Sequence, residues 1–216
     1  MRTQDSIRKI FTPVIVVLFF VGVIMIMLVY NTMREHPTTI EIEVVKDVPD
    51  FTLTNQFHEE ISRDDLLGYF WIVNFIFTNC GGTCPVMTFQ MHSLQNEISS
   101  ELPVRFVSIT VDPERDTPDV LHAYAEEAGA DQSRWFFLTG ETEKIYNLAR
   151  EGFLLGVDPE GGTHREPIMH SQRFVLVDAD GMIRGYYDGF DEEQVNLLNR
   201  DLYILLGEAP EYVDSQ

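Results

Sequence analysis

The sequence predicts an α/β domain, in which a central β-sheet carries helices on both faces, preceded by one N-terminal transmembrane helix. Three observations support this prediction. Apolar runs without polar alternation, typical of strands buried on both faces, alternate with amphipathic helical segments. Near the C-terminus, the turn Asp178-Ala179-Asp180-Gly181 joins two apolar runs and indicates a β-hairpin. The stretch from Ile10 to Tyr30 contains no charged residue.

Composition and charge limit the possible classes of protein. The chain has 216 residues, of which 44% are hydrophobic and 12% aromatic, so it can bury the core of one ordinary domain. A second full domain is not expected. The formal net charge of -20 argues against binding nucleic acid, whose phosphates require a basic surface.

The N-terminal segment has the properties of a membrane anchor. Residues 10–30 are almost entirely apolar, and about 20 such residues in a helix span the hydrocarbon core of a bilayer. Arg2, Arg8 and Lys9 precede this run, which places residues 1–9 in the cytoplasm and exports the rest to the bacterial periplasm or its equivalent. A cleaved signal peptide is the alternative, but the run exceeds the usual core of about 7–15 residues and no small-residue cleavage pattern follows it. A retained single-pass anchor is therefore favoured.

The first part of the exported chain reads as a linker followed by a hairpin, a short helix and a strand. Residues 31–46 form the juxtamembrane linker, and the alternation at 40–44 fits either a short strand or a solvated tether. Asn55-Gln56-Phe57-His58 marks the turn of a hairpin. Ser62 caps a helix that ends at Gly68. The expected elements are hairpin strands at 48–54 and 59–62, a helix at 62–68 and a buried strand at 71–77.

The second part alternates helices and strands and then closes with a hairpin and a helix. Met87, Met91, Leu94 and Ile98 form one stripe of the first long helix. The expected elements are helices at 86–98, 118–128, 141–150 and 192–206, strands at 104–111, 135–138, 174–177 and 183–187, and an irregular loop at 156–167. This order describes the thioredoxin architecture over residues 47–206. The acidic tail at 207–216 is expected to be mobile.

Cys80 and Cys84 are the only two cysteines, and they lie between a buried strand and a helix. Four residues correspond to one helical turn, so the two thiols can point the same way. Ligands gather at the carboxyl ends of strands in α/β sheets, and the start of a helix favours a thiolate. The pair could therefore hold a soft metal, exchange disulfides or form a plain stabilising disulfide.

The number of available ligands separates the candidate metals. Structural zinc requires four ligands, and no second cysteine pair exists, whereas copper(I) accepts two or three soft ligands. His170 stands just ahead of the strand at Phe174, where a thioredoxin-like fold brings the chain beside the cysteine helix. Met87 and Met169 carry thioether sulfur but are expected to be core residues. His36 is beside the membrane, His58 is in a turn, and His92 and His122 are on helices, so these four are expected to be surface or capping residues, whereas His164 borders the same loop as His170.

Several motifs together resemble the Sco/SenC family of membrane-anchored copper proteins. The resemblance covers roughly residues 47–206 and includes the anchor. The matching motifs are Phe77-Thr78-Asn79-Cys80, Cys84-Pro85, Ser108 to Pro118 with its Val-Asp-Pro-Glu-Arg-Asp-Thr-Pro sequence, and His170 ahead of Phe174-Val175-Leu176-Val177-Asp178.

The resemblance implies a thioredoxin-like domain that binds one copper ion, as Cu(I) or Cu(II), through Cys80, Cys84 and His170. Such proteins assist assembly of the dinuclear copper centre in subunit II of cytochrome c oxidase, as copper donors, as thiol reductants, or both; another copper recipient is also compatible. Two thiolates and an imidazole suit both oxidation states of copper. Asp112 is the candidate for orienting the imidazole.

Two departures from the family pattern keep a second function open. Family members often carry a proline and an acidic residue between the cysteines, whereas this chain has Gly81-Gly82-Thr83. Pro167 lies three residues before His170 rather than directly ahead of the strand, which disfavours a general disulfide exchanger. The alternative is a membrane-tethered thiol–disulfide oxidoreductase, or a peroxiredoxin-like reductase, with Cys80 and Cys84 as its redox-active pair.

Overall fold

The computed structural model describes residues 21–28, 42–79, 84–158 and 169–207; at positions 84, 158, 169 and 170 it describes the backbone only. The chain divides into two compact units, residues 1–41 and residues 42–216, which are considered separately. In the first unit, residues 21–28 are helical. No helix within the described ranges is long and apolar enough to cross a membrane. The rest of the expected span at 10–30 lies outside those ranges, so the anchor remains a prediction.

The second unit is built on a mixed sheet of eight described strands in the order β1-β10-β9-β4-β5-β6-β2-β3. Its centre is parallel, because β4 pairs in parallel with β5 and β5 with β6. β9 runs antiparallel to β4 on the other side. The strands are β1 (Lys46–Asp47), β2 (Thr52–Asn55), β3 (Glu60–Ser62), β4 (Phe70–Ile76), β5 (Val104–Thr110), β6 (Trp135–Thr139), β9 (Arg173–Val177) and β10 (Met182–Asp188).

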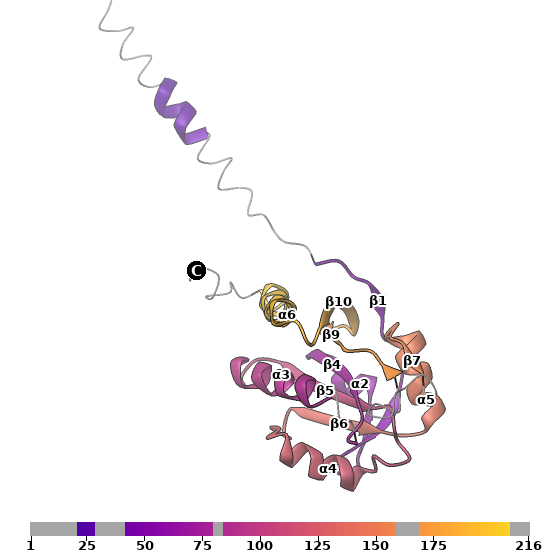
Figure 1. The fold of residues 1–216 in the computed structure, drawn as a ribbon. Helices are drawn as coiled ribbons and strands as arrows, with labels where there is room; N and C mark the ends of the chain where they lie inside the picture. The colour runs from indigo at the N-terminus through magenta and orange to yellow at the C-terminus, as the bar shows by residue number, and fades with distance from the viewer. Residues whose placement is uncertain (1–20, 29–41, 80–83, 159–168, 208–216) are drawn as a thin grey trace, which may run out of the picture. The chain divides into compact units, whose positions relative to one another are not determined.

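Helices cover both faces of this sheet (Figure 1). Two of them, α2 and α4, begin where the sequence signals predict. Ser62 caps α2 in a reciprocal capping box with Asp65, and Thr117 caps α4 directly ahead of Pro118. The helices are α2 (Arg63–Leu66), α3 (Cys84–Glu97), α4 (Pro118–Glu127), α5 (Thr142–Asn147), which continues as a π-helical turn at Leu148–Gly152, and α6 (Glu192–Leu205).

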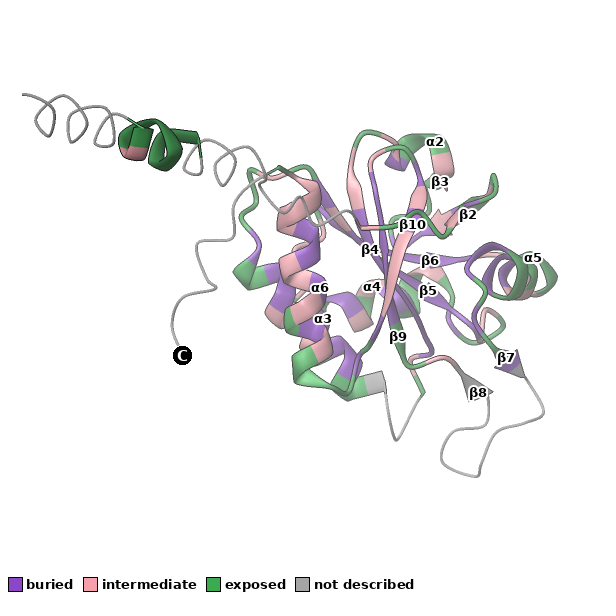
Figure 2. Ribbon diagram, turned by 90° about the horizontal axis from the view of Figure 1, so that it is seen from above, coloured by how far each residue is buried: buried purple, intermediate pink, exposed green. Residues whose placement is uncertain are grey.

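The core has two layers, one on each side of the central strands. On β4, Ile72 and Ile76 belong to the layer beneath α3, α4 and α6, whereas Val73 and Phe75 belong to the layer beneath α2, α5 and the π-helical turn. Figure 2 shows the buried central strands between α3 and α6 on one side and α5 on the other. Burial on both faces explains why β4 reads as a continuous apolar run. Each fully buried large apolar side chain stabilises the fold by about 1.5–3 kcal/mol.

Most predicted elements are confirmed, including the terminal hairpin, but two predictions were wrong in detail. Of the two alternatives left open for residues 40–44, the described part agrees with a tether, because residues 42–45 form no regular structure and β1 begins at Lys46, which pairs with Ile183 of β10. The expected irregular loop at 156–167 begins with β7 (Val157–Asp158), which pairs with β8 (Met169–His170). The helix expected to reach residue 150 ends at Asn147 and continues as the π-helical turn. β1 and β7 share one property that explains why they were not predicted, since a two-residue strand is defined by its pairing partner.

Candidate functional site

The candidate site lies at the carboxyl edge of the two central parallel strands. β4 and β5 are in register from Phe70 opposite Val104 to Ile76 opposite Thr110, so both strands end together. The register continues one residue further, because the Val111 N–H donates to the Ile76 carbonyl at 2.8 Å. The segments that leave β4 and β5 therefore start side by side, as in other open α/β sheets where ligands bind at this edge.

The described segments next to the three predicted ligands start or end near this edge. The segment after β4 leads to Cys80, which lies outside the described residues. Cys84 begins α3, the helix that follows this segment. β9 is antiparallel to β4, so it begins at the same edge, and His170 at the end of β8 lies three residues before it. The side chains of Cys84 and His170 are outside the description, so their role as ligands remains a prediction.

Asp112, the predicted partner of the imidazole, is at this edge directly after β5. Its side chain is 16% exposed, and its backbone N–H donates to the Thr110 hydroxyl at 3.0 Å. One carboxylate oxygen lies 3.5 Å from the Arg115 guanidinium. Burial raises the pKa of Asp112, and the nearby carboxylates of Asp116 and Glu114 add to this increase while Arg115 opposes it. Asp112 is therefore a partly buried acceptor with only one weak cationic partner among the described residues.

Tyr146 of α5 lies at the same edge, on the face of the sheet that α5 covers. Its hydroxyl donates to the Val111 carbonyl at 3.1 Å. Burial raises the pKa of Tyr146, and the charge of Asp112 raises it further. The phenol thus stays neutral and holds the backbone immediately before Asp112.

Asp116 is a polar residue of this edge that sequence reasoning missed. It is fully buried, and its carboxylate accepts a hydrogen bond from the Thr78 N–H at 3.0 Å and from the Thr78 and Thr110 hydroxyls, both at 2.5 Å. Hydrogen bonds to a charged group typically contribute about 1.5–3 kcal/mol each. Asp116 connects the segment after β4 with the end of β5. The only signal in the sequence is its place in the acidic motif after β5, which does not reveal burial.

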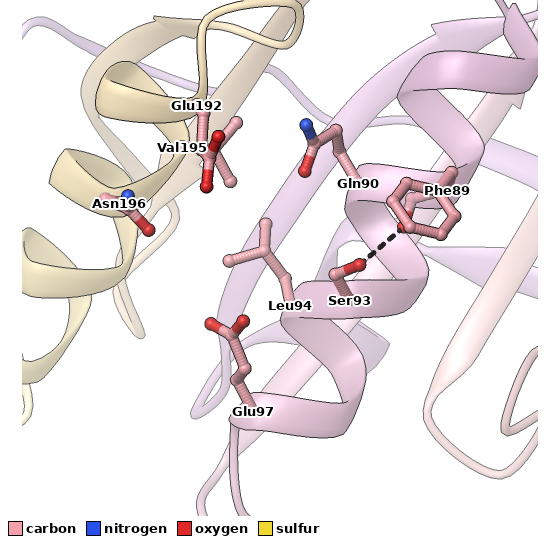
Figure 3. A pocket seen from close by; sticks show the side chains of 8 residues that line it. All are labelled: Phe89, Gln90, Ser93, Leu94, Glu97, Glu192, Val195 and Asn196. Carbon is pink, nitrogen blue, oxygen red and sulfur yellow. Dashed lines mark hydrogen bonds between the residues drawn. The ribbon is translucent and has the colours of Figure 1, made fainter.

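A groove between α3 and α6 is separate from this edge. It has a volume of about 230 Å³. In Figure 3, Gln90 and Leu94 of α3 face Glu192 and Val195 of α6. Its lining is completed by Phe89, Ser93, Glu97 and Asn196. None of these side chains carries sulfur or imidazole, so the groove offers no ligand for a soft metal.

The other sequence candidates that the structure describes have structural places. Met87 is fully buried in the core beneath α3, as expected. His58 lies on the surface, 2.8 Å from Asp119, and His122 lies 3.7 Å from Glu126. Within the described part of the chain, no three His, Cys, Asp or Glu side chains are grouped so that they could hold a metal ion.

Comparison with known proteins agrees with the fold. The family model described as SCO1/SenC matches residues 42–200, which include every described strand and α6 as far as Arg200. This chain belongs to the SCO1/SenC family. The matched region also contains both cysteines, Asp112, Asp116 and His170.

Individual relatives match two thirds or more of this chain. A SCO1 protein homolog of Bacillus subtilis is 36% identical over 148 residues, which is 67% of this chain and 75% of the relative. A Stutzerimonas stutzeri protein whose description names copper binding is 28% identical over 161 residues, 72% of this chain and 76% of the relative. The solved structure of BsSco, described as a cytochrome c oxidase assembly protein with a disulfide switch, superimposes with a TM-score of 0.66 at 32% identity, covering 77% of this chain and 98% of that one.

Proposed function

We propose that this protein is a membrane-anchored copper chaperone that binds one copper ion through Cys80, Cys84 and His170. Copper is its cargo, for delivery to the dinuclear centre in subunit II of cytochrome c oxidase. One observation carries the proposal: the segment leading to Cys80, the helix beginning at Cys84 and the strand following His170 all start at one edge of the sheet. Membership of the SCO1/SenC family supports it, as do relatives described by copper binding and oxidase assembly.

The proposed donor set fits copper that must be released again. Two thiolates and one imidazole satisfy Cu(I) and are also acceptable to Cu(II). Three ligands leave room for a donor from the recipient, so the ion can move by ligand exchange. Asp112 would accept a hydrogen bond from the second ring nitrogen of His170 and hold the imidazole in place.

The proposed location follows from the N-terminal sequence. Residues 10–30 would cross the membrane once, with Arg2, Arg8 and Lys9 on the cytoplasmic side and the SCO1/SenC domain exported. An exported chaperone would meet its recipient at the membrane surface. The anchor also restricts the domain to that surface, which raises the local concentration of the two partners.

The ligand set can be tested on the full chain in detergent micelles. The reduced protein is loaded with copper, and stoichiometry, thiolate-to-copper absorption and paramagnetic resonance are recorded for wild type, Cys80→Ser, Cys84→Ser and His170→Ala. We expect one copper per chain in wild type and loss or strong weakening of binding in each variant. His58→Ala is the matched control, because this surface histidine lies at the hairpin turn. Unchanged binding by His170→Ala would reject the ligand set.

A thiol–disulfide oxidoreductase is the second candidate. It is favoured by the position of Cys84 at the beginning of α3, where the helix dipole stabilises a thiolate. The disulfide switch named for BsSco points to thiol chemistry in that relative. This function predicts that the copper-free, reduced chain turns over a disulfide substrate, and that His170→Ala keeps this activity. Turnover that depends on copper or on His170 would contradict it.

A further inference from the structure

We propose that Asp116 is a positioning residue, which fixes the segment carrying Cys80 relative to the segment carrying Asp112. The inference deepens the proposed function and rests on it for the identity of the cargo. It concerns a residue that binds no metal itself. Its action would run through Thr78 and Thr110, the two threonines that its carboxylate contacts.

The first part of the argument is the cost of burying this carboxylate. Asp116 is fully buried, and no Lys, Arg or His side chain within the described ranges forms an ion pair with it. A buried charge without a cation is unfavourable unless hydrogen bonds replace its hydration. Here three neutral donors from two segments converge on it. The buried carboxylate keeps these hydrogen bonds only while the segments of Thr78 and Thr110 both keep their positions. It therefore ties the two segments together.

The second part is the short distance along the chain from Thr78 to Cys80. Two residues of extended chain span at most about 7 Å, so fixing Thr78 by its N–H and its hydroxyl strongly restricts where Cys80 can lie.

The third part is the link to Asp112. The Thr110 hydroxyl donates to Asp116 and accepts a hydrogen bond from the Asp112 N–H at 3.0 Å. The Asp116 N–H also donates to the Asp112 carbonyl at 2.9 Å. The Asp116 carboxylate thus holds Thr78, in the segment that leads to Cys80, and also the segment of Asp112, the proposed partner of His170. Loss of this tie would let the two segments move independently.

An asparagine weakens this tie, although it has the same shape. The Thr78 N–H and the Thr110 hydroxyl share one carboxylate oxygen, and the Thr78 hydroxyl faces the other. An amide oxygen can take the first place, but the NH₂ group then faces the Thr78 hydroxyl, which must turn to accept, and the hydrogen bonds lose the charge that strengthens them. Asp116→Asn therefore weakens the tie with little change in volume.

The test uses the full chain in detergent with two readouts. The first is Cu(I) affinity, measured by competition with a chromophoric chelator. The second is the rate at which iodoacetamide alkylates Cys80 in the reduced, copper-free chain, followed by mass spectrometry. Asp116→Asn is compared with Asp201→Asn. Asp201 is also a buried carboxylate that accepts a hydrogen bond from a hydroxyl, but it lies on α6. Thr78→Val removes one donor, and Thr78→Ser retains it.

We expect Asp116→Asn to lose about 10- to 100-fold in copper affinity, as for other residues that orient metal ligands, and to alkylate at a different rate from wild type. Thr78→Val should change both readouts in the same direction, and it decides the matter if Asp116→Asn does not fold. Thr78→Ser and Asp201→Asn should behave as wild type. Equal effects from Asp116→Asn and Asp201→Asn, or wild-type values in both readouts, would overturn the positioning role.

The two readouts also separate this inference from the proposed function. If the wild-type chain binds no copper but the Asp116→Asn and Thr78→Val chains alkylate Cys80 at altered rates, the copper chaperone is rejected while the positioning role stands. If wild type binds copper and the variants match it in both readouts, only the positioning role is rejected. If no copper binds and alkylation is unchanged, both are rejected.

Discussion

The Tyr187 hydroxyl donates a hydrogen bond to the Asp201 carboxylate at 2.8 Å, joining β10 to α6. Both residues are buried. Tyr187→Phe leaves Asp201 without this donor, so we expect the free energy of unfolding at pH 7 to fall by about 1–3 kcal/mol. Urea denaturation followed by circular dichroism measures the change. Tyr186→Phe is the matched control, because its buried hydroxyl has no hydrogen-bond partner among the described residues, and this variant should lose little or no stability.

The same pair predicts a loss of stability at alkaline pH. Burial, and then the hydrogen bond to Asp201, raise the pKa of Tyr187 far above its ordinary value of 10.0. Above about pH 10 the unfolded chain releases this proton while the folded chain keeps it, so the free energy of unfolding falls as the pH rises. The decline should be shallower in Tyr187→Phe than in wild type. Equal slopes for the two proteins between pH 9 and pH 11, in the alkaline range about the ordinary pKa, would contradict the assignment.

Met87 provides a test of which sulfur atoms bind copper. Its side chain is fully buried beneath α3 and belongs to the core layer that contains Ile76 and Phe174. Met87→Leu conserves the volume and should cost less than about 1.5 kcal/mol in unfolding free energy. Copper stoichiometry and the thiolate-to-copper absorption should not change. A variant that folds normally but loses copper would make Met87 a ligand and contradict its placement in the core.

Asp112 should matter for the copper site more than for folding. Asp112→Asn keeps the backbone hydrogen bond to Thr110 but removes the charge that would hold the His170 imidazole. We expect about a tenfold loss of copper affinity, measured by chelator competition. Stability should stay near that of wild type, because burial and neighbouring carboxylates already disfavour the charge and raise the pKa of Asp112. Asp119→Asn, on the exposed surface of α4, should leave copper affinity unchanged.

The elements that local spacing defines are predictable from the sequence. β4 reads as a buried strand because both of its faces are covered, and α3 reads as a helix because Met87, Met91, Leu94 and Ile98 form one buried stripe. Helix caps are equally local: Ser62 and Asp65 satisfy each other's backbone within one turn. The candidate ligands can also be predicted from the sequence, because cysteine spacing and family motifs are properties of the sequence.

Pairing between distant segments is less predictable. β7 and β8 are each two residues long and have no periodicity of their own, so only their mutual contact defines them. β1 likewise appears where the chain meets β10. The π-helical turn after α5 places Phe153 against Phe75, with ring centroids 5.6 Å apart, and no local pattern indicates this change of helix type.

The sequence by itself determined that this chain has one α/β domain, where its main strands and helices lie, and that two cysteines stand between a buried strand and a helix. These properties follow from side-chain period, capping and residue type over short stretches. Only the tertiary structure decided that Thr78, Thr110 and Asp116 meet, because their meeting requires the parallel register in which β4 and β5 end together. Burial makes this contact important. In the sequence Asp116 looks like one more surface acid, but in the fold it is buried and bound by two segments at once.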